Sequence, residues 1–191
     1  MSAHHRIVSS EGEELILVDR EDNEIGFLSK GECHNGAGVL HRAFSLFLFN
    51  DAGELLLQQR SSNKRLWPDY WSNSCCSHPR RGESLQIATQ RRLRDELNFA
   101  TSLEHVYHFC YTANFGAAGA ENELCHVYLG CAPGEVQAND SEIASLRFMA
   151  PADFEAELAR YPERFTPWCK QEWNELRERY RARLARYCDI S

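Results

Sequence analysis

Three histidines and two glutamates are the residues whose types most directly suggest chemistry. Two of them, Glu121 and Glu123, are two residues apart, so on a strand both side chains project from the same face. Neighbouring carboxylates repel each other unless a positive charge lies between them. Imidazole and carboxylate donors without a thiolate suit Mn²⁺, Fe²⁺, Zn²⁺ or Mg²⁺. If the segments meet, the sequence predicts a divalent-metal site; otherwise each histidine is a surface or hydrogen-bonded residue. The five positions are His34, His41, His78, Glu121 and Glu123.

A second set lies in the polar segment 73–79, where Cys76 precedes His78 by two residues and two arginines follow. Such surroundings predict an accessible thiol with a lowered pKa, suited to proton transfer or nucleophilic work. The alternative is a small buried hydrophobic residue, which is the commoner role of a free cysteine.

Basic residues are concentrated between Arg60 and Arg94, although the whole chain has a net charge of −7. A basic patch on an acidic protein suits a small polyanion such as a diphosphate, and the alternative is a solvated face. The overall acidity disfavours a nucleic-acid partner. The basic residues of this segment are Arg60, Lys64, Arg65, Arg80, Arg81, Arg91, Arg92 and Arg94, against the acids Asp69 and Glu83.

Aromatic residues form a further candidate set, because an electron-rich ring face can stabilise a cation. Trp168 follows a proline at the expected start of a helix, and Tyr111 lies on an expected strand. Aromatic side chains more often pack in a core, and this is the prediction for Trp67 and Trp71.

The elements that must position these residues are short strands and a few helices. Most strands follow one another as hairpins and one helix lies between them, which predicts an α+β mixed sheet. Segments 31–38 and 67–79 are expected to be loops, and a turn at 50–53 predicts a hairpin between its flanking strands. The expected strands are 14–18, 25–28, 42–50, 54–59, 106–114, 122–131 and 144–149, and the expected helices are 84–97, 151–161 and 167–187.

Length and composition set the broad class. The 191 residues, 43% hydrophobic and 26% charged, are typical of one soluble globular domain. Eight cysteines without a C-x-x-C pair favour reduced thiols. The sequence has no run of about 18 apolar residues, and its first 20 residues do not resemble a secretory signal. These features predict a cytoplasmic protein without a membrane partner.

The order of the motifs resembles the type I isopentenyl-diphosphate isomerases of the Nudix superfamily over about 26–173. The resemblance implies a Nudix-type mixed β-sheet packed with helices, in a single domain over 1–191 with a C-terminal helix at 167–187. The motifs are His34…His41-Arg-Ala-Phe-Ser, Trp67-Pro-x-x-Trp71-Ser-Asn-Ser-Cys-Cys-Ser-His-Pro79, Gly82-Glu-Ser84…Arg91-Arg-Leu-x-Asp-Glu-Leu97, Glu121-Asn-Glu123 and Asn139-Asp-x-Glu142.

The same resemblance implies roles for individual residues. It implies a catalytic cysteine at Cys76 and a catalytic glutamate at Glu123 assisted by Tyr111, and Trp168 would face a cationic intermediate. A second Mg²⁺, bound with the substrate diphosphate, would be held by Glu96 and the Cys76 carbonyl. The diphosphate itself would be bound by Lys30, Arg60, Lys64 and Arg92, and the first metal by His34, His41, His78, Glu121 and Glu123.

The implied cofactors are Mg²⁺ and Mn²⁺, with Zn²⁺ as an alternative at the His/Glu site. The implied partner is a small diphosphate substrate, and the protein is expected to be a monomer or a weak homo-oligomer. The implied reaction is the interconversion of isopentenyl and dimethylallyl diphosphate, a step of isoprene biosynthesis, by protonation and deprotonation through a tertiary carbocation.

The chain departs from the motif of ordinary Nudix hydrolases. Ser77 stands where those enzymes have the first glycine, Arg92 where they have a glutamate, and Asn98 where they have the last glycine. Losing a carboxylate weakens an Mg²⁺ cluster for phosphoanhydride hydrolysis, and gaining an arginine favours diphosphate binding, so an isomerase is preferred. Two alternatives remain: a Nudix hydrolase of a diphosphate-linked substrate, and a non-catalytic, metal-stabilised binding module.

Overall fold

The structure is a computed structural model and describes residues 7–190. Its strands form one connected sheet around β3 (His41–Phe49), which is buried along almost its whole length. The other strands are β1 (Glu14–Val18), β2 (Glu24–Ser29), β4 (Leu55–Arg60), β5 (Trp71–Ser72), β6 (Cys75–Ser77), β7 (Leu103–Asn114), β8 (Ala120–Cys131) and β9 (Ile143–Met149). The helices are α1 (Lys30–Cys33), α2 (Leu85–Leu97), α3 (Pro151–Arg160), α4 (Pro167–Arg179) and α5 (Arg181–Leu184), with short 3-10 turns at Gly116–Ala118 and Pro162–Arg164.

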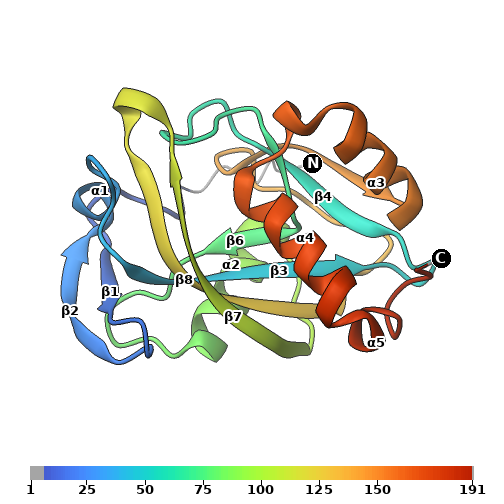
Figure 1. Cartoon of the computed structure of the whole chain (residues 1–191), viewed down its shortest axis with the longest axis horizontal. Helices are drawn as coiled ribbons and strands as arrows, with labels where there is room; N and C mark the ends of the chain where they lie inside the picture. The colour runs from blue at the N-terminus through green and yellow to red at the C-terminus, as the bar shows by residue number, and fades with distance from the viewer. Residues whose placement is uncertain (1–6, 191) are drawn as a thin grey trace.

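Strand β3 organises the sheet. It pairs in the antiparallel sense with β1, β4 and β6, and in the parallel sense with β8 from His41↔Glu123 to Phe49↔Cys131. Strands β7 and β8 form a long hairpin, and β9 pairs with β4. Parallel and antiparallel pairs in one sheet, with helices on both faces, confirm the predicted α+β mixed sheet (Figure 1).

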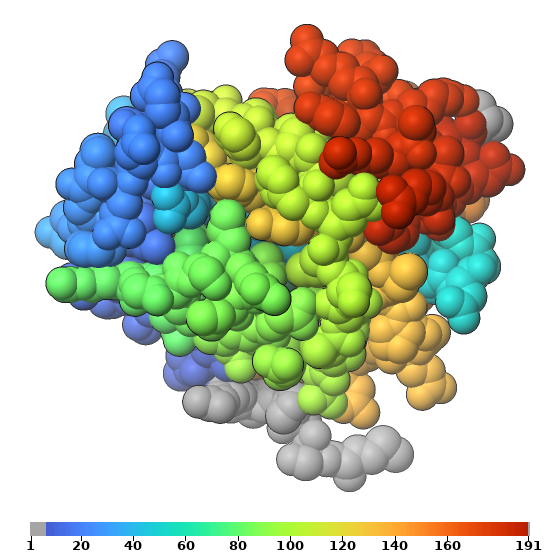
Figure 2. Space-filling view, turned by 90° about the horizontal axis from the view of Figure 1, so that it is seen from below, coloured from blue at the N-terminus to red at the C-terminus, as the bar shows by residue number. Residues whose placement is uncertain are grey.

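The two faces of β3 have different partners. Because successive side chains alternate across a strand, Ala43 and Phe47 join the core that contains Trp173 of α4. Phe44 and Leu46 join a second core with Leu93 of α2. Burying one such large apolar side chain contributes about 1.5–3 kcal/mol. Figure 1 shows α4 on one side of β3, and Figure 2, seen from below, shows the green α2 beside the yellow-green β7.

Helix α2 follows its sequence signals closely. The Ser84 hydroxyl accepts a hydrogen bond from Ile87 N at 3.2 Å, as expected of an N-cap. Asn98 ends the helix in the left-handed region, with φ 59°. The predicted helix 84–97 is therefore confirmed to within one residue.

Three segment predictions are wrong in part. Segment 31–38 begins inside α1, because the Ser29 hydroxyl caps that turn by accepting from Glu32 N at 3.3 Å. Segment 67–79 contains β5 and β6, which add to β4 and β3. The expected hairpin of β3 and β4 is paired only at Phe49↔Leu55, since β4 continues alongside β9 instead.

The predicted continuous helix 167–187 is also wrong, because α4 ends at Arg179 and α5 starts at Arg181. Tyr180 leaves the helical conformation, and its ring stacks on Tyr107 with the centroids 4.8 Å apart. Arg183 Nη1 then donates to two backbone carbonyls of β7, at 3.0 and 3.3 Å. These contacts with β7 change the direction of the chain between α4 and α5. Over the residues described, no helix has both the length and the apolar character required to span a bilayer.

Candidate active site and metal centre

A cavity of about 320 Å³ brings together segments far apart in the sequence. Its walls come from α1, α2, β6, β7, β8 and the first turn of α4. His41 and Glu96 are the two predicted site residues that do not line it. Those that do are Lys30, His34, Arg60, Lys64, Cys76, His78, Arg92, Tyr111, Glu121, Glu123 and Trp168.

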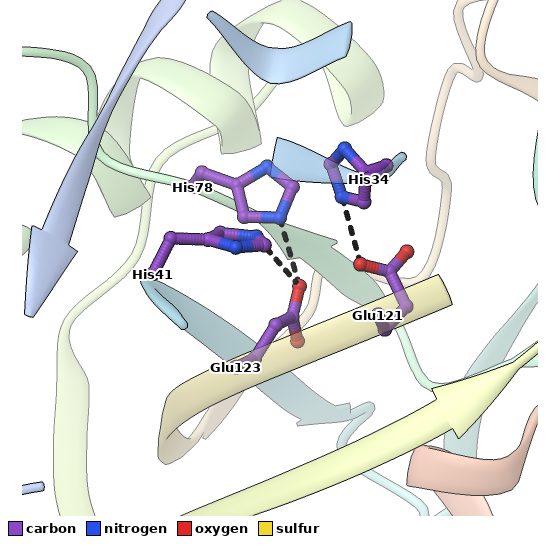
Figure 3. A group of neighbouring side chains, drawn as sticks. All are labelled: His34, His41, His78, Glu121 and Glu123. Atoms are coloured by element: carbon purple, nitrogen blue, oxygen red, sulfur yellow. Dashed lines mark hydrogen bonds and ion pairs between the residues drawn. The ribbon is translucent and has the colours of Figure 1, made fainter. Parts of the chain in front are cut away.

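The three imidazoles and two carboxylates predicted as metal ligands meet in one cluster, and all of them except His41 line the cavity (Figure 3). One ligand atom from each of the five residues lies within 4.8 Å of the others. The parallel register of β3 and β8 places His41 beside Glu123. His34 Nε2 lies 2.8 Å from Glu121 Oε2, and His78 Nε2 lies 2.8 Å from Glu123 Oε1.

Two backbone carbonyls determine which imidazole nitrogens face the carboxylates. His34 Nδ1 donates to Lys30 O and His41 Nδ1 donates to Val39 O, each at 2.7 Å. In a neutral ring Nε2 then carries a lone pair. His41 Nε2 is buried without a hydrogen-bond partner within 7–190, and Glu123 Oε1 is 3.7 Å away. Lone pairs that face carboxylate oxygens need a cation between them, so this donor set fits a divalent metal.

The ionisation of His78 and Glu123 suits metal binding, whereas His34 would have to lose its proton to bind a metal. Burial, with the other two imidazoles, holds the pKa of His78 well below its ordinary value, so the ring stays neutral. Burial opposes the charge of His34 as well, but the Glu121 carboxylate outweighs it and raises the pKa of His34. Burial also disfavours the Glu123 carboxylate, yet its contacts with His41 and Tyr111 lower the pKa of Glu123. Tyr111 Oη donates to Glu123 Oε2 at 2.5 Å.

Gly119 allows the start of β8 to approach α1. Its φ is +130°, and a Cβ built there would lie 2.0 Å from the His34 carbonyl oxygen. Ala120 N donates to that same oxygen at 3.1 Å. The close approach therefore places His34 directly opposite Glu121.

Gly119→Ala is expected to lower the unfolding free energy by about 1–3 kcal/mol and to weaken metal binding, because the new methyl group displaces the His34 backbone. Urea unfolding and a metal titration measure the two effects. Gly116→Ala is the matched control, since Gly116 has φ +60° but open space around it. Equal losses in both variants would show that the approach to His34 is unimportant.

Cys76 lies on β6 beside Ser45 of β3, and its surroundings contradict part of the sequence prediction. The thiol donates to Asn73 Oδ1 at 3.2 Å and accepts from Trp168 Nε1 at 3.3 Å. Burial raises the pKa of Cys76 to about 12, although Arg60 opposes this. The expected lowered pKa is therefore wrong, because the segment is packed under α4 and is not an open polar loop. The thiol stays protonated at neutral pH.

Basic residues line the cavity as well, and with them lies a carboxylate that the sequence did not single out. Glu142 contacts Lys64, and its Oε2 accepts from Arg92 Nη2 at 2.9 Å. Burial opposes its charge, but Lys64 and Arg92 lower the pKa of Glu142 to about 2. Glu142 belongs to the motif Asn139-Asp-x-Glu142, to which the sequence assigned no role. Its pairing with Arg92, 50 residues away, is a tertiary contact without a local signal.

Arg92 is itself buried, and it also holds the predicted second-metal ligand. Arg92 Nε donates to Glu96 Oε1 at 2.7 Å, and both side chains are almost fully buried. Glu96 thus lies behind Arg92 and does not line the cavity. Its contact with a second Mg²⁺ stays a prediction, as does that of the Cys76 carbonyl.

Trp168 and Arg60 form the wall next to the thiol. The Arg60 guanidinium lies 5.3 Å from the Trp168 ring centroid. Its Nε and Nη2 donate to the carbonyls of Trp67 and Leu66, so the side chain is held in place. Trp67 is buried, as expected of a core residue, whereas Trp71 is half-buried under Arg147.

Glu172 is a buried carboxylate behind the site that sequence reasoning missed. It is fully buried on α4, where Cys125 Sγ donates to its Oε1 at 3.4 Å. Burial raises the pKa of Glu172 to about 8 from an ordinary value of 4.5. Glu172 belongs to a highly charged helix, and no local pattern distinguishes it from the exposed acids of that helix.

Glu172→Gln is expected to change how stability depends on pH. Between pH 4.5 and 8 the folded protein keeps the Glu172 proton and the unfolded chain does not, so wild-type stability falls as pH rises. Relative to Glu172→Gln, the wild type should lose roughly 1 kcal/mol per pH unit in this window and nothing further above it. Urea unfolding of both proteins from pH 5 to 9 measures the difference, and parallel curves would contradict the assignment.

Comparisons with known proteins show the family of the chain. The NUDIX domain model matches residues 39–169. Isopentenyl-diphosphate Delta-isomerase 1 of Photorhabdus laumondii is 38% identical over 86% of this chain and 94% of its own length. The isopentenyl-diphosphate Delta-isomerase of Serratia proteamaculans is 44% identical over 82% of this chain and 87% of its own.

A solved structure supports the fold alone. The crystal structure of DR0079 from Deinococcus radiodurans superimposes with a TM-score of 0.64 at 24% identity, over 78% of this chain and 90% of that one. The fold, the length of the match and the identity to both isomerases agree: this chain belongs to the NUDIX family and, within it, to the isopentenyl-diphosphate Delta-isomerases.

Proposed function

We propose that this protein interconverts isopentenyl diphosphate and dimethylallyl diphosphate. The observation that carries the proposal is the single cavity in which a protonated thiol, Cys76, and an ionised carboxylate, Glu123, face the same space. A double-bond shift needs both a proton donor and a proton acceptor. We propose that the protein acts as a monomer or a weak homo-oligomer.

The reaction moves the double bond from C3–C4 to C2–C3. One proton is added at C4 and one is removed from C2, so nothing is oxidised and no group leaves. We assign these two transfers to Cys76 and Glu123, with Tyr111 orienting the carboxylate through its 2.5 Å hydrogen bond. After one turnover the two groups have exchanged protonation states, and exchange with solvent restores them.

The positive charge that develops at C3 needs a dry, electron-rich environment. Trp168 is 3% exposed, and its ring centroid lies 6.3 Å from that of Tyr111. Trp168 contacts the Cys76 thiol, and Tyr111 contacts the Glu123 carboxylate. We propose that these ring faces stabilise the cation and exclude water.

We assign the diphosphate to the basic residues of the cavity. Lys30, Lys64 and Arg92 line it, and Arg60 lies next to Trp168. Burial, with nearby Lys64, lowers the pKa of Lys30, although Glu142 opposes this. A bound diphosphate would add negative charge among these cations.

The fitted metal ligands are His34, His41, His78, Glu121 and Glu123. We propose Mg²⁺ or Mn²⁺ as the cofactor, with Zn²⁺ as an alternative at this His/Glu set. A bound dication would stabilise the ionised form of Glu123 and fix its orientation.

The carboxylates of the NUDIX motif are paired with arginines, and this pairing disfavours hydrolysis. Glu83 is paired with Arg91, whose Nε donates to Glu83 Oε1 at 2.7 Å. Glu96 is paired with buried Arg92. An Mg²⁺ cluster for phosphoanhydride cleavage needs such carboxylates to be available to metal.

The test is proton NMR of isopentenyl diphosphate in D₂O with the purified protein and Mg²⁺ or Mn²⁺. Formation of dimethylallyl diphosphate with deuterium in a methyl group is expected. Release of inorganic phosphate without movement of the double bond would instead identify a hydrolase. A folded, metal-loaded protein that catalyses neither reaction would identify a binding module.

A further inference from the structure

We propose that the outer face of the β7–β8 hairpin carries a second metal site, separate from the catalytic cavity, for a zinc-class dication. Its ligands are His105, His108 and His126, and Asp22 orients one of them. None of these residues lines the cavity. Because side chains alternate along a strand, His126 projects from the face of β8 opposite to that of Glu123.

The three imidazoles are arranged as ligands of one ion. Their nearest ring nitrogens all lie within 4.8 Å of one another. His108 and His126 are direct neighbours across β7 and β8, and His126 Nδ1 lies 3.1 Å from His105 Nε2. Two nitrogens bound to one tetrahedral zinc are about 3.3 Å apart, because each Zn–N bond is about 2.0–2.1 Å long. A small rotation of exposed His108 completes the set and leaves a fourth position for water.

A β-bulge is what places His105 in the group. In a regular strand, residues three apart project from opposite faces, so His105 and His108 would be separated by the sheet. Here the register passes from His105↔Tyr128 to Tyr107↔Val127, and Val106 is the additional residue. The bulge therefore turns His105 to the same face as His108. Bulges commonly redirect a side chain at functional positions.

Asp22 supplies the outer support typical of metal-bound histidines. Its Oδ2 lies 3.0 Å from His126 Nε2, so that nitrogen donates to the carboxylate and Nδ1 presents its lone pair. Asp22 is held in turn by Arg42, whose Nε donates to Oδ1 at 2.7 Å and whose Nη2 donates to the main-chain oxygen at 2.7 Å. This arrangement connects the β1–β2 turn to the β7–β8 hairpin.

The chemistry of the donors selects the class of ion. Three imidazole nitrogens suit Zn²⁺, Co²⁺, Ni²⁺ or Cu²⁺, whereas Mg²⁺ and Mn²⁺ prefer oxygen.

The experiment counts Zn²⁺ bound to the full chain by calorimetry and by metal analysis after dialysis. The wild type is expected to bind one more equivalent than the His105→Ala/His108→Ala variant. Asp22→Asn should lower the affinity for this additional Zn²⁺ by about 10–100-fold, because the single amide oxygen cannot replace both carboxylate oxygens that accept from Arg42 and His126. Imidazole ¹⁵N resonances of the three histidines should shift on binding.

The controls separate this site from other donors. Cys110→Ser removes a thiol on the same face of β7, and His4→Ala/His5→Ala removes the two histidines near the start of the sequence; both should keep the additional equivalent. Isomerisation with saturating Mg²⁺ should be unchanged in the His105→Ala/His108→Ala variant. Equal Zn²⁺ stoichiometry and affinity in the wild type and that variant would overturn the proposal.

Discussion

Cys76→Ala is expected to lower the rate of isomerisation by about 10²–10⁴-fold or more, the contribution typical of one general acid–base group. The thiol holds its proton at neutral pH, because burial raises the pKa of Cys76 to about 12. Alanine fills most of the same space but has no proton to move. Turnover is measured by NMR at saturating substrate and metal.

The variant should otherwise resemble the wild type. The thiol contacts Asn73 and Trp168 but none of the five metal ligands, so metal stoichiometry is expected to be unchanged. Circular dichroism and urea unfolding would show that the fold is retained.

Cys75→Ala is the matched control for this variant. Cys75 is the adjacent residue, but it is fully buried in the core that contains Leu93, on the other face of the sheet. Its loss should cost stability and leave turnover intact. Unchanged turnover in Cys76→Ala, or an equal loss in Cys75→Ala, would remove Cys76 from the mechanism.

Glu123→Gln is expected to have the second large effect, because one carboxylate serves two purposes. Its Oε1 lies beside His78 and His41, and its Oε2 accepts from Tyr111. The amide can neither take a proton from carbon nor bind a dication as a carboxylate does. Turnover should fall by about 10²–10⁴-fold even at saturating metal, and metal affinity should fall as well.

Glu121→Gln separates the two purposes. Glu121 is on the same face of β8 and contacts His34, but among the described contacts it has none with Tyr111. Its amide variant should lose metal affinity and recover turnover when metal is added in excess. If Glu123→Gln also recovers under these conditions, Glu123 is a metal ligand and does not transfer protons.

The sequence predicted much of this site because its motifs are local. Ser84 at the start of α2 and the spacing of Glu121 and Glu123 are properties of neighbouring residues, and the structure has both as expected. That the imidazoles meet those carboxylates depends on the parallel pairing of β3 with β8. This pairing joins residues about 80 positions apart and was not predicted, and only the resemblance to a family implied that the five ligands meet.

The remaining failures have the same physical origin. The pKa of Cys76 depends on burial by α4, and the pairing of Glu142 with Arg92 depends on a tertiary contact. His105 and His108 were not singled out from the sequence, and three-residue spacing on a regular strand places side chains on opposite faces. Only the additional residue of the bulge, Val106, brings them together.

The position of Trp168 determines when the active site forms during synthesis and folding. Trp168 of α4 forms the wall beside Cys76. Helix α4 lies in the last quarter of the chain, whereas β3 lies in about the first quarter. During synthesis the N-terminal part emerges first, and pairings over long separations form slowly. Until α4 packs on the sheet, the Cys76 thiol of the partly synthesised chain is therefore exposed to water. The active site is complete only after the C-terminal helices have folded onto the sheet.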